Sequence, residues 1–193
     1  MKFLNLGCGG QREQGDEWVN LDDLHSQLCP GTPERMKLDS EPNYVNYEIG
    51  YGPLPFRPET FDGVLMSHVL EHFDAQMGMY VMRLCHEVLK PGGVLLVSVP
   101  NASYFRDVYP DDRNENWERL FEVSDPANPI PTFFEAALWF SQHKVILTED
   151  ALWCYFIRAG FQIPASVDAA VLGPMSALLN RRKFSIEMLG IKP

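Results

Sequence analysis

The sequence predicts an α/β fold in which a doubly wound, mainly parallel sheet is covered by helices. Short apolar runs alternate with segments of helical spacing, which is the pattern of successive βαβ units. The first apolar run, at 3–6, breaks directly into the turn Gly-Cys-Gly-Gly. The run at 94–99 is apolar almost throughout, as a strand buried on both faces should be.

The first two strands are expected at Phe3–Leu6 and Trp18–Asp22. Because only residues 7–17 separate them, a crossover helix has room for one or two turns at most, or is absent. Glycine has no Cβ and accepts positive φ, so the turn at Gly7 and Gly9 lets a ligand lie directly on the backbone. Ligands of open α/β sheets bind at the carboxyl ends of strands, so we expect the site to begin here.

Three further strands are expected at 44–49, 62–67 and 94–99. Apolar residues at helical spacing predict a helix over 75–89. The Lys-Pro-Gly-Gly stretch at 90–93 should end that helix and turn the chain back, because proline cannot continue a helix and glycine allows the turn.

Residues 101–147 form an insertion after the fifth strand that is rich in proline and aromatic residues. An insertion of this length is usually functional or disordered, and its aromatic content argues against disorder. We therefore expect one domain, 1–193, whose insertion is a substrate lid or a partner arm. A helical subdomain with aromatic core residues is the alternative.

The C-terminal part is expected to return to the sheet. Thr148 is a predicted N-cap for a helix that runs through Ala159 and stops at Gly160. Residues 161–193 should then supply the last strands, with 184–189 the best candidate.

Composition narrows the classes of partner. The 193 residues carry a formal net charge of −10, which argues against a nucleic-acid or an anionic-membrane partner. The four cysteines, Cys8, Cys29, Cys85 and Cys154, form no Cys-x-x-Cys pair, as expected for reduced thiols in a cytosolic protein. With no signal-like start and no apolar run near about 18 residues, we expect a cytoplasmic protein.

Several segments together resemble the class I S-adenosylmethionine-dependent methyltransferases, most closely the small methyltransferase-domain group. Each segment is weak alone, but their order and spacing form a strong signal. The segments are the glycine turn with its strand at 4–9, the acid at 22, the Leu-Pro-Phe and Phe-Asp run within 48–62, Ser-His-Val-Leu-Glu-His at 67–72, Leu-Lys-Pro-Gly-Gly at 89–93, and 147–161. The resemblance implies a Rossmann-like sheet of seven strands, with a shortened first helix, and S-adenosylmethionine as cofactor.

The resemblance also implies the binding residues. Asp22 is the expected ribose acid, since an ionised carboxylate accepts hydrogen bonds from both hydroxyls of a diol. Glu48 and the backbone of Ile49 are expected beside the adenine. Asn5 stands where many relatives carry an acid that holds the amino group of the cofactor. The predicted cofactor-binding residues are Asn5, Gly7, Cys8, Gly9, Asp22, Glu48, Ile49 and Ser67.

The implied reaction is displacement of a methyl group from a sulfonium by an acceptor oxygen, nitrogen or carbon. A hydroxyl or a protonated amine must also lose a proton, and His68, which follows the fourth strand, is the predicted general base. A structural role for His68 as a helix cap is equally open. We expect the acceptor to be a small molecule or a glycan precursor.

Three other functional classes share some of these sequence features. A nicotinamide-binding domain would need a third glycine and an acid about 20 residues on, whereas Asp22 comes too soon. The string at 68–72 matches the His-x-x-Glu-His zinc-hydrolase signature, but it follows a buried strand, and no metal is predicted. A non-catalytic module that only binds S-adenosylmethionine stays open, because no residue is a certain catalyst.

Overall fold

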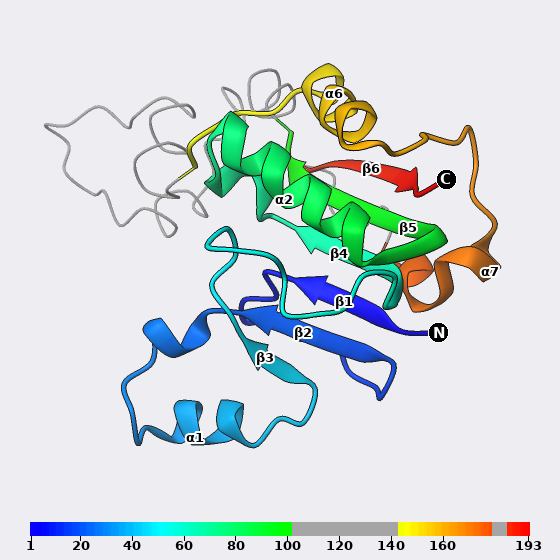
Figure 1. The fold of residues 1–193 in the computed structure, drawn as a ribbon. Helices are drawn as coiled ribbons and strands as arrows, with labels where there is room; N and C mark the ends of the chain where they lie inside the picture. Colours follow the sequence, from blue (N-terminus) through cyan, green and yellow to red (C-terminus); the bar gives the residue numbers. More distant parts are fainter. Residues whose placement is uncertain (102–142, 179–184) are drawn as a thin grey trace, which may run out of the picture.

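The computed structural model describes residues 1–101, 143–178 and 185–193, which build a sheet with helices on both faces (Figure 1). The strand order is β3-β2-β1-β4-β5-β6, and β6 alone runs antiparallel to its neighbour. The strands are β1 (Phe3–Leu6), β2 (Trp18–Asp22), β3 (Tyr44–Asn46), β4 (Phe61–Ser67), β5 (Leu89–Pro100) and β6 (Ser185–Ile191). Because the chain order reverses between β1 and β4, the predicted doubly wound α/β fold is confirmed.

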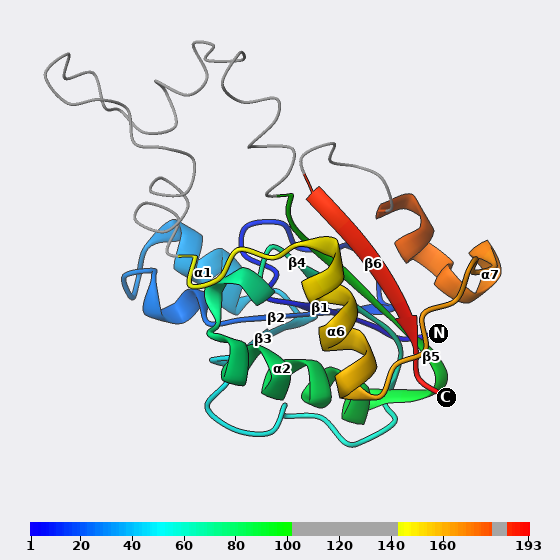
Figure 2. The same ribbon diagram turned by 90° about the horizontal axis from the view of Figure 1, so that it is seen from above.

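The helices cover the two faces unequally, as Figure 2 shows from above. The α-helices are α1 (Pro33–Asp39), α2 (Ala75–Val88), α6 (Glu149–Ala159) and α7 (Ala169–Leu172), and the 3₁₀ helices are η1 (Leu24–Ser26), η2 (Leu70–His72) and η3 (Gly173–Leu178). The longer helices α2 and α6 pack on one face, and the short α7 and η3 pack on the other. No helix in the described ranges is long and apolar enough to cross a membrane.

Alternation along each strand divides the core in two. Leu4 and Leu6 of β1 point toward α2 and α6 and join the larger apolar cluster. Phe3 points to the opposite face, where it packs against Trp18 and the buried Met175 of η3. Both faces of the central strands are therefore buried, as their nearly continuous apolar sequences predict.

The connection from β1 to β2 contains no helix, which confirms that the short spacing leaves room for one or two turns at most. Two asparagines opposite each other in β1 and β2 hold it instead (Asn5 and Asn20). The Asn5 amide donates to the Gln11 carbonyl and to Asn20 Oδ1, both at 3.0 Å. Asn20 accepts from the Glu13 N–H and donates to the Glu13 carbonyl, each at 2.9 Å. Side-chain amides thus satisfy backbone groups that a helix would satisfy internally.

Two strand boundaries differ by three residues or more from the sequence prediction. The third strand ends at Asn46 instead of residue 49. The fifth begins at Leu89, so the expected turn at 90–93 belongs to the strand. Its register explains this, because Gly92 donates to the carbonyl of Lys192, and the N–H of Lys192 donates to Gly93, which ties the stretch to the chain just after β6.

The C-terminal helix agrees with the prediction. The Thr148 side chain accepts a hydrogen bond from the N–H of Ala151, and α6 ends at Gly160 in the left-handed region. Among the described residues, 161–193 contribute one sheet strand, β6, rather than several. A single antiparallel bridge between Gln162 and Ile191 lies where a seventh strand would pair. The helices α1 and α7 are additions that the sequence analysis did not predict.

Candidate functional site

A cleft of about 480 Å³ lies at the carboxyl ends of β1, β2, β3 and β4. Its volume falls within the usual range for a small-molecule site. It is lined by Gly7, Gly9, Asp22, Asp23, Ser26, Gln27, Glu48, Ile49, His68, Val69, His72 and Phe73. Six of the nine residues predicted for the site therefore meet in one cleft. They come from the carboxyl ends of four strands: Gly7 and Gly9 after β1, Asp22 in β2, Glu48 and Ile49 after β3, and His68 after β4.

The glycine turn forms the floor of the cleft. Gly7 and Gly9 have φ of 70° and 50°, in the left-handed region that side chains disfavour. A Cβ on Gly7 would collide with the side chain of Val69. A Cβ on Gly9 would meet no atom within 4 Å and would extend into open space instead. The backbone of Gly9 is therefore accessible to a ligand, as the sequence predicts.

Asp22 is part of the turn as well as of the cleft. One carboxylate oxygen accepts from the N–H of Gly9 at 2.7 Å, and the other accepts from the N–H of Asp23 at 2.7 Å. An ionised carboxylate offers about four acceptor positions, so two remain. The Asp22 carboxylate can thus fix the glycine turn and still accept from a diol.

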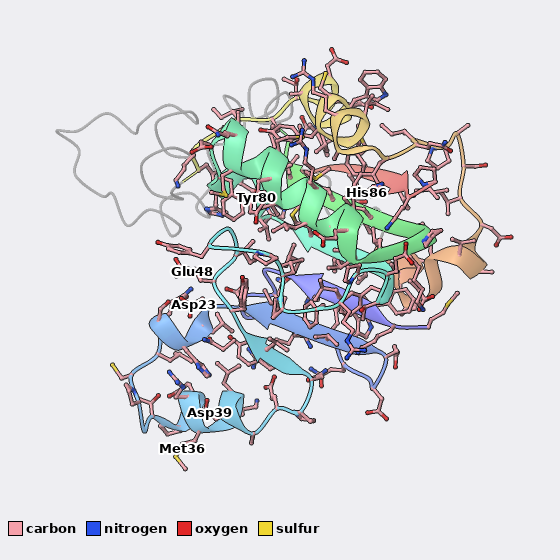
Figure 3. All side chains as sticks on the ribbon, viewed as in Figure 1. Asp23, Met36, Asp39, Glu48, Tyr80 and His86 are labelled. Carbon is pink, nitrogen blue, oxygen red and sulfur yellow. The ribbon has the colours of Figure 1, made fainter. Side chains whose placement is uncertain are left out.

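Glu48 and Asp23 come from neighbouring loops at this end of the sheet, as their labels in Figure 3 show. Glu48 is exposed and Ile49 is half-buried, and both border the cleft. Asp23 is the N-cap of η1, and its side chain accepts from the N–H of Ser26. The cleft therefore has an acidic rim, of which Asp23 was not predicted from sequence.

The remaining predicted residues line a second, smaller pocket of about 90 Å³ that shares Gly7 with the cleft. Asn5, Cys8 and Ser67 border it, together with Ser98 and other residues. The amide nitrogen of Asn5 is committed to the β1–β2 connection, so this asparagine has a structural role that its sequence position did not predict.

Burial, together with the nearby carboxylate of Asp22, raises the pKa of Cys8 to about 12. Its thiol is therefore neutral at physiological pH. Cys8 can line a ligand pocket, but it is not a nucleophile there.

His68 occupies a strained position directly after β4. Its φ of 57° is unusual for a residue with a side chain, and such outliers cluster at functional sites. The Nε2 atom lies 2.9 Å from Ser185 Oγ, and the Nδ1 atom lies 3.3 Å from Oε1 of Glu71. The ring thus contacts Ser185 on one side and lies near the Glu71 carboxylate on the other, at the edge of the cleft.

The string at 68–72 does not have the geometry of a zinc-peptidase helix. His68 stands in a turn, and only Leu70–His72 form a single 3₁₀ turn, η2. The buried Glu71 instead meets His143, whose Nε2 lies 4.0 Å from Glu71 Oε1. The rings of His72 and His143 pack edge to face with centroids 4.9 Å apart. Sequence reasoning missed His143 because nothing local relates it to residues 71 and 72.

Burial lowers the pKa of His143. The Glu71 carboxylate acts in the opposite direction, but at 4.0 Å it does not hydrogen bond and its attraction is the smaller effect. The backbone holds His143 near Glu71, because the N–H groups of Lys144 and Val145 both donate to the Glu71 carbonyl. The rest of the predicted insertion, residues 102–142, lies outside the described residues.

Comparison with known proteins agrees with this geometry. Residues 19–97 match the family described as "Methyltransferase domain". No curated protein matches the chain.

Solved structures share the fold across nearly the whole chain. An S-adenosylmethionine-dependent methyltransferase from Archaeoglobus fulgidus is 17% identical with a TM-score of 0.56, over 99% of this chain and 86% of that one. A second, from Mesorhizobium loti, is 17% identical with a TM-score of 0.55, over 99% and 90%. The 1,6-didemethyltoxoflavin N1-methyltransferase of Burkholderia thailandensis, solved with S-adenosylhomocysteine, is 19% identical with a TM-score of 0.55, over 98% and 70%.

Proposed function

We propose that the chain is a class I S-adenosylmethionine-dependent methyltransferase, which uses S-adenosylmethionine as its cofactor and methylates a small molecule or a glycan precursor in the cytoplasm. The observation that carries the proposal is the convergence of Gly9, Asp22, Glu48 and His68 on one cleft. The glycine turn and the two acids suit a nucleoside, and His68 in the same cleft suits proton transfer.

The residues of the two pockets fit the cofactor. In our proposal Asp22 accepts hydrogen bonds from the ribose hydroxyls, and Glu48 and Ile49 meet the adenine in the cleft. The smaller pocket beyond Gly7, with Asn5, Cys8 and Ser67, takes the methionine end. Open space above Gly9 supports this arrangement, because a ligand can approach the backbone there.

The bound cofactor supplies an activated methyl group, so the protein mainly has to align the acceptor and remove its proton. Alignment can contribute roughly 7–11 kcal/mol. His68 is the proposed base, and its contact with Ser185 Oγ supports this role. A hydroxyl group already lies within hydrogen-bonding distance of Nε2, and an acceptor hydroxyl would take an equivalent position.

Charge supports a small acceptor over a polyanion. The chain carries a net charge of −10, and the cleft is bordered by the acids Asp22, Asp23 and Glu48. A nucleic acid or an anionic membrane surface would be repelled from this rim. A neutral or cationic small molecule would not.

Calorimetric titration with S-adenosylhomocysteine tests the cofactor site. We expect micromolar binding that Asp22→Ala weakens at least about tenfold, because charge-assisted hydrogen bonds contribute roughly 1.5–3 kcal/mol each. Asp150→Ala, an exposed acid in the first turn of α6, is the matched control and should bind as the wild type does. Equal affinity of the Asp22 and Asp150 variants would remove the ribose role.

Turnover with methyl-labelled S-adenosylmethionine and a panel of small hydroxyl and amine acceptors tests His68. We choose His68→Asn, because asparagine tolerates the left-handed backbone better than alanine does. Turnover should fall about 10²–10⁴-fold while the affinity for S-adenosylhomocysteine stays nearly unchanged. Unchanged turnover in the His68→Asn variant would refute the base role. If the wild-type protein transfers no methyl group to any acceptor, a module that only binds the cofactor is favoured.

A further inference from the structure

Glu71 is a buried carboxylate without a hydrogen-bonding partner among the described residues. The residue is 1% exposed, and neither of its oxygens accepts a hydrogen bond there. Burying an ionised carboxylate is costly unless a cation or donors compensate. His68 Nδ1 and His143 Nε2 lie 3.3 and 4.0 Å from Oε1, but neither forms a hydrogen bond with it, so the carboxylate can still accept a cation.

Imidazole rings surround the Glu71 carboxylate. Together with Glu71, His72 and His143 offer three ligand atoms that all lie within 4.8 Å of one another. His68 Nδ1 is also near, at 3.3 Å from Glu71 Oε1, but its Nε2 atom is directed to Ser185. The group thus contains one carboxylate and two imidazoles whose ligand atoms lie close together.

Backbone hydrogen bonds bring the segments that carry these three side chains together. His72 follows Glu71 in the 3₁₀ turn η2, whose Val69 carbonyl accepts the His72 N–H. His143 is fixed by the next two residues, because Lys144 and Val145 donate to the Glu71 carbonyl at 2.8 and 3.3 Å. One main-chain carbonyl therefore holds the incoming segment beside the acid.

We propose that Glu71, His72 and His143 bind one divalent transition-metal ion of the zinc type. Two imidazoles and a carboxylate are ligands that Zn²⁺ accepts, in a set that leaves a fourth position open. Ligand atoms of a tetrahedral zinc lie about 3.4 Å apart, so the three must close by roughly an ångström on binding. The site differs from the His-x-x-Glu-His pattern, because Glu71 is a ligand and His143 replaces His68.

The ion would lie at the wall of the cleft, since His72 lines it. Its fourth position would take water or an oxygen atom of the acceptor, which makes an oxygen-bearing acceptor the expected substrate class. This last step rests on the proposed function, but the metal site itself does not.

Zinc and cobalt binding to the full chain tests the site. After treatment with a chelator, the protein should bind one equivalent of Zn²⁺ by elemental analysis. It should also develop the visible absorption of tetrahedral Co²⁺, which Zn²⁺ then displaces. Thermal unfolding should shift upward with added Zn²⁺, because an ion that binds only the folded state stabilises it.

Three variants identify the ligands. His143→Ala and His72→Ala should each lower the affinity for Co²⁺ at least about tenfold. Glu71→Gln should do the same while keeping the shape of the side chain. His86→Ala is the control, because this half-buried histidine lies on the last turn of α2, whereas His72 lies just before the first turn of that helix. If Glu71→Gln does not fold, the two histidine variants still show whether this cluster binds the metal.

Two results would overturn the proposal. One is the absence of Zn²⁺ and Co²⁺ binding at micromolar metal. The other is unchanged Co²⁺ affinity in His143→Ala. Titration with S-adenosylhomocysteine distinguishes failure of the metal site from failure of the proposed function. If the protein binds S-adenosylhomocysteine but no metal, the proposed function stands without the metal site. If it binds metal but no S-adenosylhomocysteine, the metal site stands and the proposed function is refuted.

Discussion

The two faces of the sheet are built differently. On one face, α2 and α6 cover the strands with a continuous apolar cluster that includes Phe156, Leu152 and Met82. On the other face, the short α7 and η3 cover a much smaller cluster around Phe3 and Met175. The difference arises where the chain omits a helix between β1 and β2.

Polar groups take the place of the omitted helix. Asn5 and Asn20 are buried on the thinly covered side and bond to the loop at 7–17. The small pocket beside Gly7 opens on the same side. One face therefore supplies most of the apolar stability, whereas the other uses hydrogen bonds to shape the floor of the site.

The largest expected effect is the loss of unfolding free energy when a buried side chain is truncated on either face of the sheet. Met82→Ala and Met175→Ala both remove a fully buried methionine, one from each face. Such truncations cost about 2–5 kcal/mol, and less where neighbours can move into the space. We expect Met82→Ala near the upper end and Met175→Ala near the lower end, since η3 is short. Urea unfolding followed by circular dichroism measures both, and equal losses would contradict the comparison.

The second prediction concerns the polar face. Asn20→Ala leaves the N–H of Glu13 and the amide of Asn5 without their acceptor, which should cost about 1–3 kcal/mol. Amide hydrogen exchange in 7–17 should accelerate in the same variant. Asn43→Ala is the matched control, because its amide makes only a longer bond of 3.4 Å to the Glu13 carbonyl. If both variants behave alike, Asn20 does not hold the loop.

The smallest expected effect is a pH dependence on the apolar face. Burial lowers the pKa of His86 below the ordinary value of 6.5, and Lys192 adds to the shift. The unfolded chain then binds the proton more readily, so this contribution to stability is present above about pH 6.5 and is lost as the pH falls toward the folded pKa. His86→Gln should flatten the fall in unfolding free energy over that window. An unchanged slope would assign the dependence to other groups.

Local sequence features predicted most of the elements correctly. The strands β1, β2 and β4, the helices α2 and α6, and the glycine turn are visible in periodicity, caps and the absence of a Cβ. Strand β5 begins five residues before the predicted start at residue 94, because the pairing of Gly92 and Gly93 with Lys192 is not a local property. The bridge between Gln162 and Ile191 could not be predicted for the same reason, since it joins distant parts of the chain.

The sequence by itself determined where ligand-facing residues stand along the chain, because strand ends and glycine turns are encoded by neighbouring residues. Only the tertiary structure decided how those residues are shared between the cleft and the smaller pocket at Gly7. It alone brought His143 to Glu71 and paired Asn5 with Asn20. These contacts depend on strand register and on the return of a distant segment, which no local pattern specifies.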